Sequence, residues 1–285
     1  VKAAEELERK YDTGLQTRAV WPFMEWFVYL FSVLFAGYHY ITAGIGVPVD
    51  YWHMGFHMSG VILLVFILYP AFRTPETREQ RPASWWHLAN VPLWDWVFII
   101  VGIAASLYIG VTWYGLDLSF LGIDLKLPEQ VMRQGNPAAI DIVFGTALII
   151  VLLEAVRRTL GIIVPIIISI FTVYAVFGPW MPLQILQHPG ISWSQYINNM
   201  YFPAEGIFGV TLWIVSTVVF QFVLFGVLAQ RMGLGQFFVD IAAVIAGRYT
   251  GGLAKVSVVS SAFFGTISGS SIANTVSTGS LTIPN

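Results

Sequence analysis

The 285-residue chain contains no cysteine and few charged side chains. The absence of cysteine excludes disulfides, thiolate metal sites and cysteine nucleophiles. Charged residues make up 11% of the chain, well below the roughly 25% of soluble proteins, whereas hydrophobic residues make up 56% and the mean hydropathy is +0.72. This balance excludes an ordinary soluble domain and indicates a membrane protein with several spans.

The motifs of common catalytic and nucleotide-binding sites are also missing. No Walker sequence ending in GK[ST] occurs, so we do not expect this chain to use ATP. Neither a GxSxG elbow nor an HExxH motif is present, and no histidine or aspartate lies near the serine-rich C-terminal stretch to activate a nucleophile. We therefore expect no enzyme, no organic cofactor and no nucleic-acid partner.

Six apolar stretches of 19 to 24 residues run through the chain. Each is long enough for a helix to cross a hydrocarbon core of about 30 Å. Aromatic residues such as Trp21 and Trp113 mark many of their ends, as in the headgroup belt of membrane proteins. The sequence therefore predicts an all-α polytopic membrane protein with six transmembrane helices, at about 21–41, 51–72, 93–113, 138–156, 161–182 and 206–229.

Lysine and arginine are distributed unevenly between the two sides of these spans. Twelve of the fourteen lie in the N-terminal tail or in every second connection, whereas Lys126 and Arg133 lie on the other side. The positive-inside rule then places the N-terminus in the cytoplasm. Because six spans return the chain to its starting side, the segment after residue 229 is expected at the cytoplasmic face.

The segment at about 236–250 has the pattern of a short amphipathic helix. It is too short and too interrupted to span, which favours an interfacial helix lying in the membrane plane. Glycines at 233–235 and 251–252 give it hinge-like ends. The alternative is a plain connector. The apolar residues that recur at helical spacing are Phe237, Phe238, Ile241, Val244 and Ile245.

After Gly251 an apolar run changes abruptly into small and polar residues. Twelve of the sixteen positions from Gly265 to Ser280 are glycine, serine, threonine or asparagine. The apolar part is too short to span, and non-helical backbone at membrane depth persists only where protein buries it or a polar cavity adjoins it. This pattern indicates a re-entrant hairpin, the kind of broken helix with which transporters bind ions and substrates.

Three histidines are weaker candidates for a site. His53 and His57 stand at i and i+4, the spacing of a helical metal pair. Neighbouring aromatic residues favour packing at the membrane interface instead, and His39 is interpreted in the same way.

The acidic residues of the spans lie near helix ends, at Glu25, Asp95, Asp141 and Glu154. Glu154 can pair with Arg157 or Arg158 at i+3 or i+4, which predicts a structural clamp. We expect Asp95 to anchor its helix rather than to relay protons.

Several runs of the sequence resemble one family, the tripartite ATP-independent periplasmic (TRAP) transporters, in their fused permease. They are EGIFG at Glu205–Gly209, then VLFGVLAQRMGLGQFFVDIA, GGLAKV, FGTISGSSIAN and TGSLTIP. Upstream, EAVRRTLG and FGPWMP are similar to the family's linking region. The likeness is specific over about residues 150–284 and looser over 21–140. A four-helix small subunit joined to the large permease resembles the subtype served by TAXI-type binding proteins.

This resemblance implies a multi-pass permease of the cell inner membrane that works by an elevator motion. It implies a sodium gradient as the driving force and a periplasmic solute-binding protein that delivers a small carboxylate. We expect an N-terminal fragment of a longer permease, since the chain begins at Val1 and stops within a motif at Asn285. The implied regions are a cytoplasmic tail (1–20), a small-subunit-like scaffold (21–158), two large-subunit helices (159–235), the arm helix (236–250) and an incomplete first hairpin (251–285).

The hairpin tip supplies the expected binding residues. Sodium is a hard cation that prefers oxygen ligands, which hydroxyls, amides and free carbonyls provide without formal charge. A second half-helix beginning near Asn274 would present its N-terminal amides to a substrate carboxylate. The alternative is close helix packing by small residues. The expected sodium or substrate ligands are Ser268, Gly269, Ser270, Ser271, Asn274 and Thr278, with Ser268, Ser270 and Asn274 as the sodium ligands.

Two other functions stay open at this stage. One is a stand-alone sodium/anion carrier of the elevator type, which needs no binding protein. The other is a non-transporting membrane scaffold or receptor subunit, in which the tip only packs. The sequence does not select among C4-dicarboxylates, 2-oxoacids, glutamate and sugar acids as substrates, and membrane lipid is an expected partner in each case.

Overall fold

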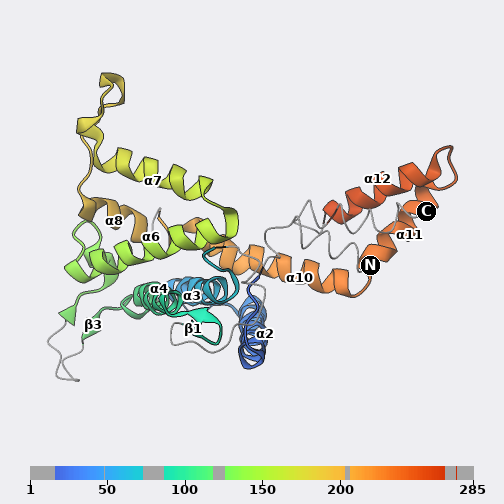
Figure 1. Cartoon of the computed structure of the whole chain (residues 1–285), viewed down its shortest axis with the longest axis horizontal. Coiled ribbons are helices and arrows are strands. Elements are labelled where there is room, and N and C mark those ends of the chain that lie inside the picture. The colour runs from blue at the N-terminus through green and yellow to red at the C-terminus, as the bar shows by residue number, and fades with distance from the viewer. Residues whose placement is uncertain are drawn as a thin grey trace. The chain divides into compact units, whose positions relative to one another are not determined.

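The computed structural model describes residues 17–47, 49–72, 87–117, 126–202, 206–266 and 274. These residues belong to two compact units, each described here by itself (Figure 1). The first unit is Thr17–Thr217, and the described part of the second is 218–266 with Asn274. Most of the described chain is helical, as the composition and periodicity predict.

Five of the six predicted spans are confirmed as helices long and apolar enough to cross a membrane. Every end lies within four residues of its predicted position. The fifth of them is a composite that runs from the first unit into the second. The spans are α2 (Pro22–Ile45), α3 (Asp50–Leu68), α4 (Leu93–Val111), α6 (Ala139–Leu160) and the run α9 (Val210–Ile214), η6 (Val215–Val219) and α10 (Phe220–Arg231).

The stretch predicted to span at 161–182 is shorter than expected. It forms α7 (Ile163–Val176), whose 14 residues extend about 21 Å at about 1.5 Å per residue. The helix ends just before the 3₁₀ turn η4 (Gly178–Trp180), where Pro179 has no N–H to continue the ladder. Beyond it lie η5 (Gln184–Leu186) and the nine-residue α8 (Trp193–Tyr201).

Two small hairpins interrupt the otherwise helical first unit. In one, β1 (His87–Leu88) pairs antiparallel with β2 (Val91–Pro92) just before α4. Its two turn residues have positive φ, which matches the geometry of a two-residue hairpin turn. In the other, β3 (Leu116–Asp117) pairs with β4 (Lys126–Leu127), and the short α5 (Gln130–Arg133) follows.

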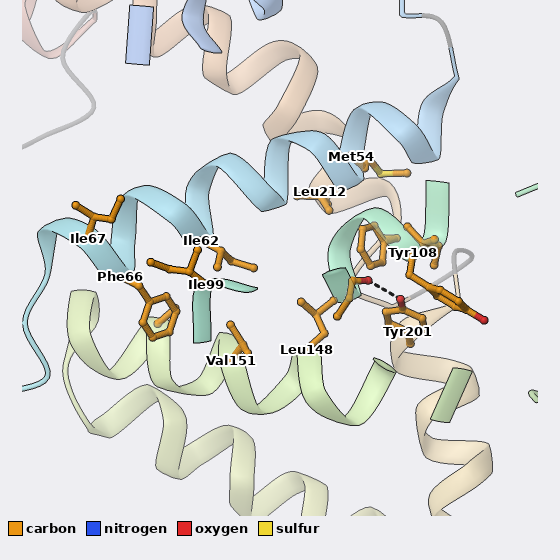
Figure 2. Close-up of a cluster of buried hydrophobic side chains, with 14 of the residues drawn as sticks. Met54, Ile62, Phe66, Ile67, Ile99, Tyr108, Leu148, Val151, Tyr201 and Leu212 are labelled. Carbon is orange, nitrogen blue, oxygen red and sulfur yellow. Dashed lines mark hydrogen bonds between the residues drawn. The ribbon is translucent and has the colours of Figure 1, made fainter. Parts of the chain in front are cut away.

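The core of the first unit lies between α3, α4 and α6. Figure 2 shows its buried apolar side chains, among them Ile62 and Phe66 of α3, Ile99 of α4, and Leu148 and Val151 of α6. Tyr201 of α8 closes one end of this cluster. Much of α2 and α7 carries exposed apolar side chains instead, as expected of helix faces that contact lipid.

Glycines allow α3 and α4 to approach closely. A Cβ placed on Gly55 would lie 2.5 Å from the carbonyl oxygen of Ser106, and one on Gly110 would lie 2.7 Å from Cα of Trp52. Both neighbours are backbone atoms, which cannot move aside as a flexible side chain can. Small residues at such contacts are typical of membrane helix pairs, where close backbone approach drives association.

We predict that Gly55→Ala separates α3 from α4 and destabilises the protein. Overpacking of a tight contact costs about 1–3 kcal/mol, so the midpoint of thermal unfolding in detergent should fall measurably. Gly37→Ala on α2 is the matched control, because no atom lies within 4 Å of its added Cβ. Equal shifts for the two variants would show that the close contact is not what limits stability.

Candidate functional site

The second unit is built on two antiparallel helices, α11 (Leu234–Ala246) and α12 (Gly252–Gly265). Each helix is preceded by a glycine in the left-handed region, Gly233 at φ 91° and Gly251 at φ 73°. Other residues adopt this conformation at a cost, so glycine is favoured at both corners. A helix is thus confirmed near the predicted 236–250, as α11, which begins two residues earlier and ends four residues earlier than predicted.

Aromatic and small side chains join α11 to α12. The ring of Phe238 stacks on Phe263 at 5.5 Å and meets Phe264 edge-on at 6.0 Å. Nearer the connection, Ala242 and Ala246 are buried against Val256. Three other apolar residues of α11 point outward: Phe237, Val244 and Ile245 are at least half exposed. This outer face suits lipid, although the interfacial position of α11 stays a prediction.

One of the six predicted tip residues lies in the described part of the chain, and it folds back on α12. The side-chain Nδ2 of Asn274 donates to the Ser261 carbonyl oxygen at 3.1 Å. In return the Ser261 hydroxyl donates to Asn274 Oδ1 at 3.4 Å. The chain therefore returns to α12 thirteen residues after leaving Ser261, as a hairpin requires. The other five predicted residues lie outside the described residues: Ser268, Gly269, Ser270, Ser271 and Thr278.

A buried aspartate organises one end of the first unit. Asp95 accepts a hydrogen bond from Arg18 Nη2 at 2.6 Å on one carboxylate oxygen and from Arg158 Nη2 at 2.7 Å on the other. All three side chains are almost fully buried. The guanidinium of Arg158 also lies 4.5 Å over the ring of Phe66. Asp95 thus anchors α4, as predicted, and joins it to α6 and to the N-terminal segment.

The predicted clamp of Glu154 is confirmed and involves both arginines. Arg157 donates to the two oxygens of Glu154 at 2.7 and 2.8 Å, and Arg158 Nε donates at 2.7 Å. Arg157 also reaches the carbonyl oxygen of Ala71 at 2.9 Å. The clamp therefore holds the end of α6 against the segment that leaves α3.

A second buried acid organises the opposite end of α4 and α6. Asp141 accepts from the Tyr108 hydroxyl at 2.6 Å and forms an ion pair with Arg133. Its second oxygen accepts from the backbone N–H of Ala138 and so caps α6. Nearby, the Tyr201 hydroxyl donates to the Ala105 carbonyl at 2.6 Å (Figure 2). Burial raises the pKa of Tyr201 well above its usual value, so this donor stays protonated.

The histidines His39, His53 and His57 are packed inside the protein, and their position at the membrane interface stays a prediction. All three are at most 3% exposed. His39 of α2 packs against His57 of α3, and His53 of α3 lies against Trp213. Imidazole nitrogens of His39 and His57 lie 2.9 Å apart. Among the residues that the structure describes, no three acidic or histidine side chains are arranged to hold a metal ion.

His53 is bonded to a π-helical turn within the last span. Its Nε2 donates to the carbonyl oxygen of Ser216, at 3.2 Å, while Nδ1 accepts from the Tyr38 hydroxyl, at 3.1 Å. Ser216 belongs to η6, the five-residue π-helical segment between α9 and α10. The hydroxyls of Ser216 and Thr217 donate to the Trp213 carbonyl at 3.1 and 2.6 Å. Side chains thus satisfy carbonyls where the regular ladder is interrupted.

An apolar groove of about 680 Å³ lies along α7. Its lining is almost entirely aliphatic and aromatic, with Ser169 and Tyr174 as the polar residues. It offers no cationic group for a carboxylate and no cluster of oxygens for a cation. The groove therefore suits apolar matter such as lipid chains, and the hairpin around Asn274 is the better candidate for a transport site.

Long apolar helices with buried ion pairs at their ends define the class of the molecule, a multi-pass membrane protein. Residues 147–285, just under half of the chain, match the family described as "Tripartite ATP-independent periplasmic transporter, DctM component". No curated protein and no solved structure matches the chain.

The match begins within α6 and includes α7, the composite span, α11, α12 and the tip. It supports the TRAP transporter family and indicates a permease component of such a transporter. DctM components work with a periplasmic solute-binding protein. The resemblance expected over about 150–284 thus coincides with the matched segment.

Some residues of these sites have weak sequence signals. Arg133 is one of only two basic residues on the side that the positive-inside rule leaves poor in charge, and this exception is its sequence signal. Ser261 lies one turn before the glycine that starts the polar tip, and its role depends on the return of the chain. Neither residue was among the predicted site residues.

We predict that Asp95→Asn is strongly destabilising. It leaves Arg18 and Arg158 as buried cations without their common carboxylate, and breaking a buried pair costs about 3–5 kcal/mol. The free energy of unfolding in detergent micelles measures this loss. Glu154→Gln is the comparison variant and should cost less, because the side chain of Glu154 keeps 20% of its surface exposed. A loss for Asp95→Asn no larger than for Glu154→Gln would contradict this account.

Proposed function

We propose that this chain is the membrane permease of a secondary transporter that imports small organic acids using a sodium gradient. A periplasmic solute-binding protein, of TAXI type, would deliver the substrate. The observation that carries the proposal is the hairpin: α12 leads into a polar tip, and Asn274 returns to Ser261 within the segment that matches the family. Broken helices of this kind present polar backbone and side chains within a membrane.

The chemistry of this hairpin supports an ion and an anion as ligands. Oxygen atoms of uncharged side chains coordinate sodium without placing a carboxylate in lipid, where ionised groups are costly. Asn274 and the neighbouring Ser268 and Ser270 would supply such oxygens, with Gly269, Ser271 and Thr278 beside them. Backbone N–H groups at the start of a helix after the tip would bind the substrate carboxylate.

The two ends of the first unit support its role as a scaffold. Residues 21–158 would brace the moving part, held rigid by the Asp95 and Asp141 clusters. Residues 159–235 would begin the large permease subunit, α11 would act as an arm at the interface, and the hairpin would move with the substrate as an elevator. The charge distribution supports an inner-membrane protein with a cytoplasmic N-terminus, and the apolar faces of α2 and α7 would contact lipid.

Uptake into proteoliposomes tests this function. The full-length permease is reconstituted and offered labelled C4-dicarboxylates, 2-oxoacids, glutamate and sugar acids, with sodium or choline outside. Each substrate is tested with and without the cognate binding protein. We expect uptake of one carboxylate class only when both an inward sodium gradient and the binding protein are present. Uptake with sodium alone would instead identify a stand-alone carrier, and no uptake by folded protein would identify a scaffold.

We predict that Ser268→Ala and Asn274→Ala each raise the sodium concentration for half-maximal uptake. Loss of one oxygen ligand should raise it about tenfold, which corresponds to about 1.4 kcal/mol. Expression and elution volume in size-exclusion chromatography should stay near those of the unaltered protein. Impaired assembly with unchanged sodium dependence would show that the tip serves helix packing.

A further inference from the structure

Ser261 and Asn274 make a two-point contact across the hairpin. The Ser261 carbonyl has only acceptor character, so it selects the Nδ2 end of the Asn274 amide at 3.1 Å. The Ser261 hydroxyl faces the oxygen end and donates to Oδ1 at 3.4 Å. One residue of α12 thereby engages both ends of the same carboxamide.

This contact has a consequence for the orientation of the Asn274 oxygen. The terminal torsion of an asparagine side chain is broad and only roughly two-fold, so a single hydrogen bond to Nδ2 leaves a wider range of amide orientations than two bonds do. A second bond to the other end restricts that rotation. The amide oxygen is then held in one direction before any ligand arrives, and preorganisation of this kind lowers the cost of binding.

The helix face around Ser261 leaves room for this approach. Ser257, Ser261 and Gly265 follow one another at four-residue spacing on α12. A Cβ added to Gly265 would lie 3.6 Å from Asn274 Nδ2, at ordinary contact distance. Neighbouring Ser260 is instead fully buried and donates to the carbonyl of Ser257. Ser261 is therefore the hydroxyl of this helix that reaches the returning chain.

We propose that Ser261 is a positioning residue for the ion site of the hairpin, one that orients the Asn274 amide oxygen for a hard monovalent cation. The inference rests on the proposed function, because it takes Asn274 as a sodium ligand. Ser261 acts through Asn274 and need not touch the ion. Removal of its hydroxyl should therefore lower the affinity for sodium and leave the folding of α12 unchanged.

The test compares three variants of the full-length permease. Ser261→Ala removes the hydroxyl and keeps the carbonyl, Ser261→Thr restores a hydroxyl, and Ser257→Ala removes a hydroxyl one turn earlier that donates only to its own helix, at the Ala254 carbonyl. Sodium affinity is measured without transport, from the rise in unfolding temperature of the purified protein as sodium chloride replaces choline chloride. Sodium dependence of uptake is measured in parallel.

We expect Ser261→Ala to weaken sodium binding about fivefold, the factor that corresponds to the roughly 1 kcal/mol of one hydrogen bond. Ser261→Thr should restore most of the affinity, and Ser257→Ala should leave it unchanged. Combining Ser261→Ala with Asn274→Ala should weaken binding no more than Asn274→Ala alone, because the two residues act together.

The two proposals fail in distinguishable ways. If the unaltered permease shows no specific stabilisation by sodium and no sodium-dependent uptake, the proposed function is overturned, and the role of Ser261 with it. If the unaltered protein responds to sodium but Ser261→Ala has the same affinity, the positioning role alone is overturned. Equal weakening by Ser257→Ala, or no recovery in Ser261→Thr, would also overturn it, since either result would trace the effect to the helix.

Discussion

Two aspartates fix α4 and α6 to one another at both ends, and most of the first unit depends on this arrangement. Asp95 at the start of α4 is bonded to Arg158 at the end of α6, while Tyr108 near the end of α4 is bonded to Asp141 at the start of α6. In hydrocarbon no water compensates an unmatched polar group, so each carboxylate needs its partners within the protein. The antiparallel register of α4 and α6 follows from these two side-chain pairs, one at each end.

The remaining parts of the unit attach to the same two points. Arg18 brings the N-terminal segment to Asp95, and Arg133 brings the short α5 to Asp141. Between the two ends, glycines and aliphatic side chains fill the space between helices. Hydrogen bonds and ion pairs thus hold the ends of the helices together, while close packing holds their middle parts together. Such a division suits a rigid frame against which another element moves.

The fold was largely predictable from the sequence where the determining signal is local. Hydropathy correctly predicted five of the six expected spans, because helix length and apolar composition are properties of continuous segments. Hydropathy overestimated the length of the helix at 161–182, because the composition stays apolar beyond the point where Pro179 interrupts the helical hydrogen bonds. The Glu154 clamp was predictable from spacing along one helix. The pair of Arg18 and Asp95, 77 residues apart, was not, because spacing carries no record of which helix ends meet.

The candidate site follows the same division. Composition predicted a polar tip after α12, and the return of Asn274 to Ser261 agrees with a hairpin. Ser261 itself has no distinguishing signal, since serines on a membrane helix usually bond to their own turn. The burial of His39, His53 and His57 was not predicted for a related reason: their surroundings depend on contacts between different helices. The local sequence pattern predicts a helix, whereas the helices that pack against it determine the role of its polar residues.

The π-helical turn in the last span changes how sequences of this kind should be aligned. Such a turn holds one residue more than an α-helical turn, and each residue of a helix rotates the side chains by about 100°. The chain adopts this geometry over the five residues Val215–Val219, between α9 and α10. A relative with one residue fewer between Trp213 and Phe220 would form a regular α-helix there, and its alignment would need a one-residue gap inside a helix, where no loop exists.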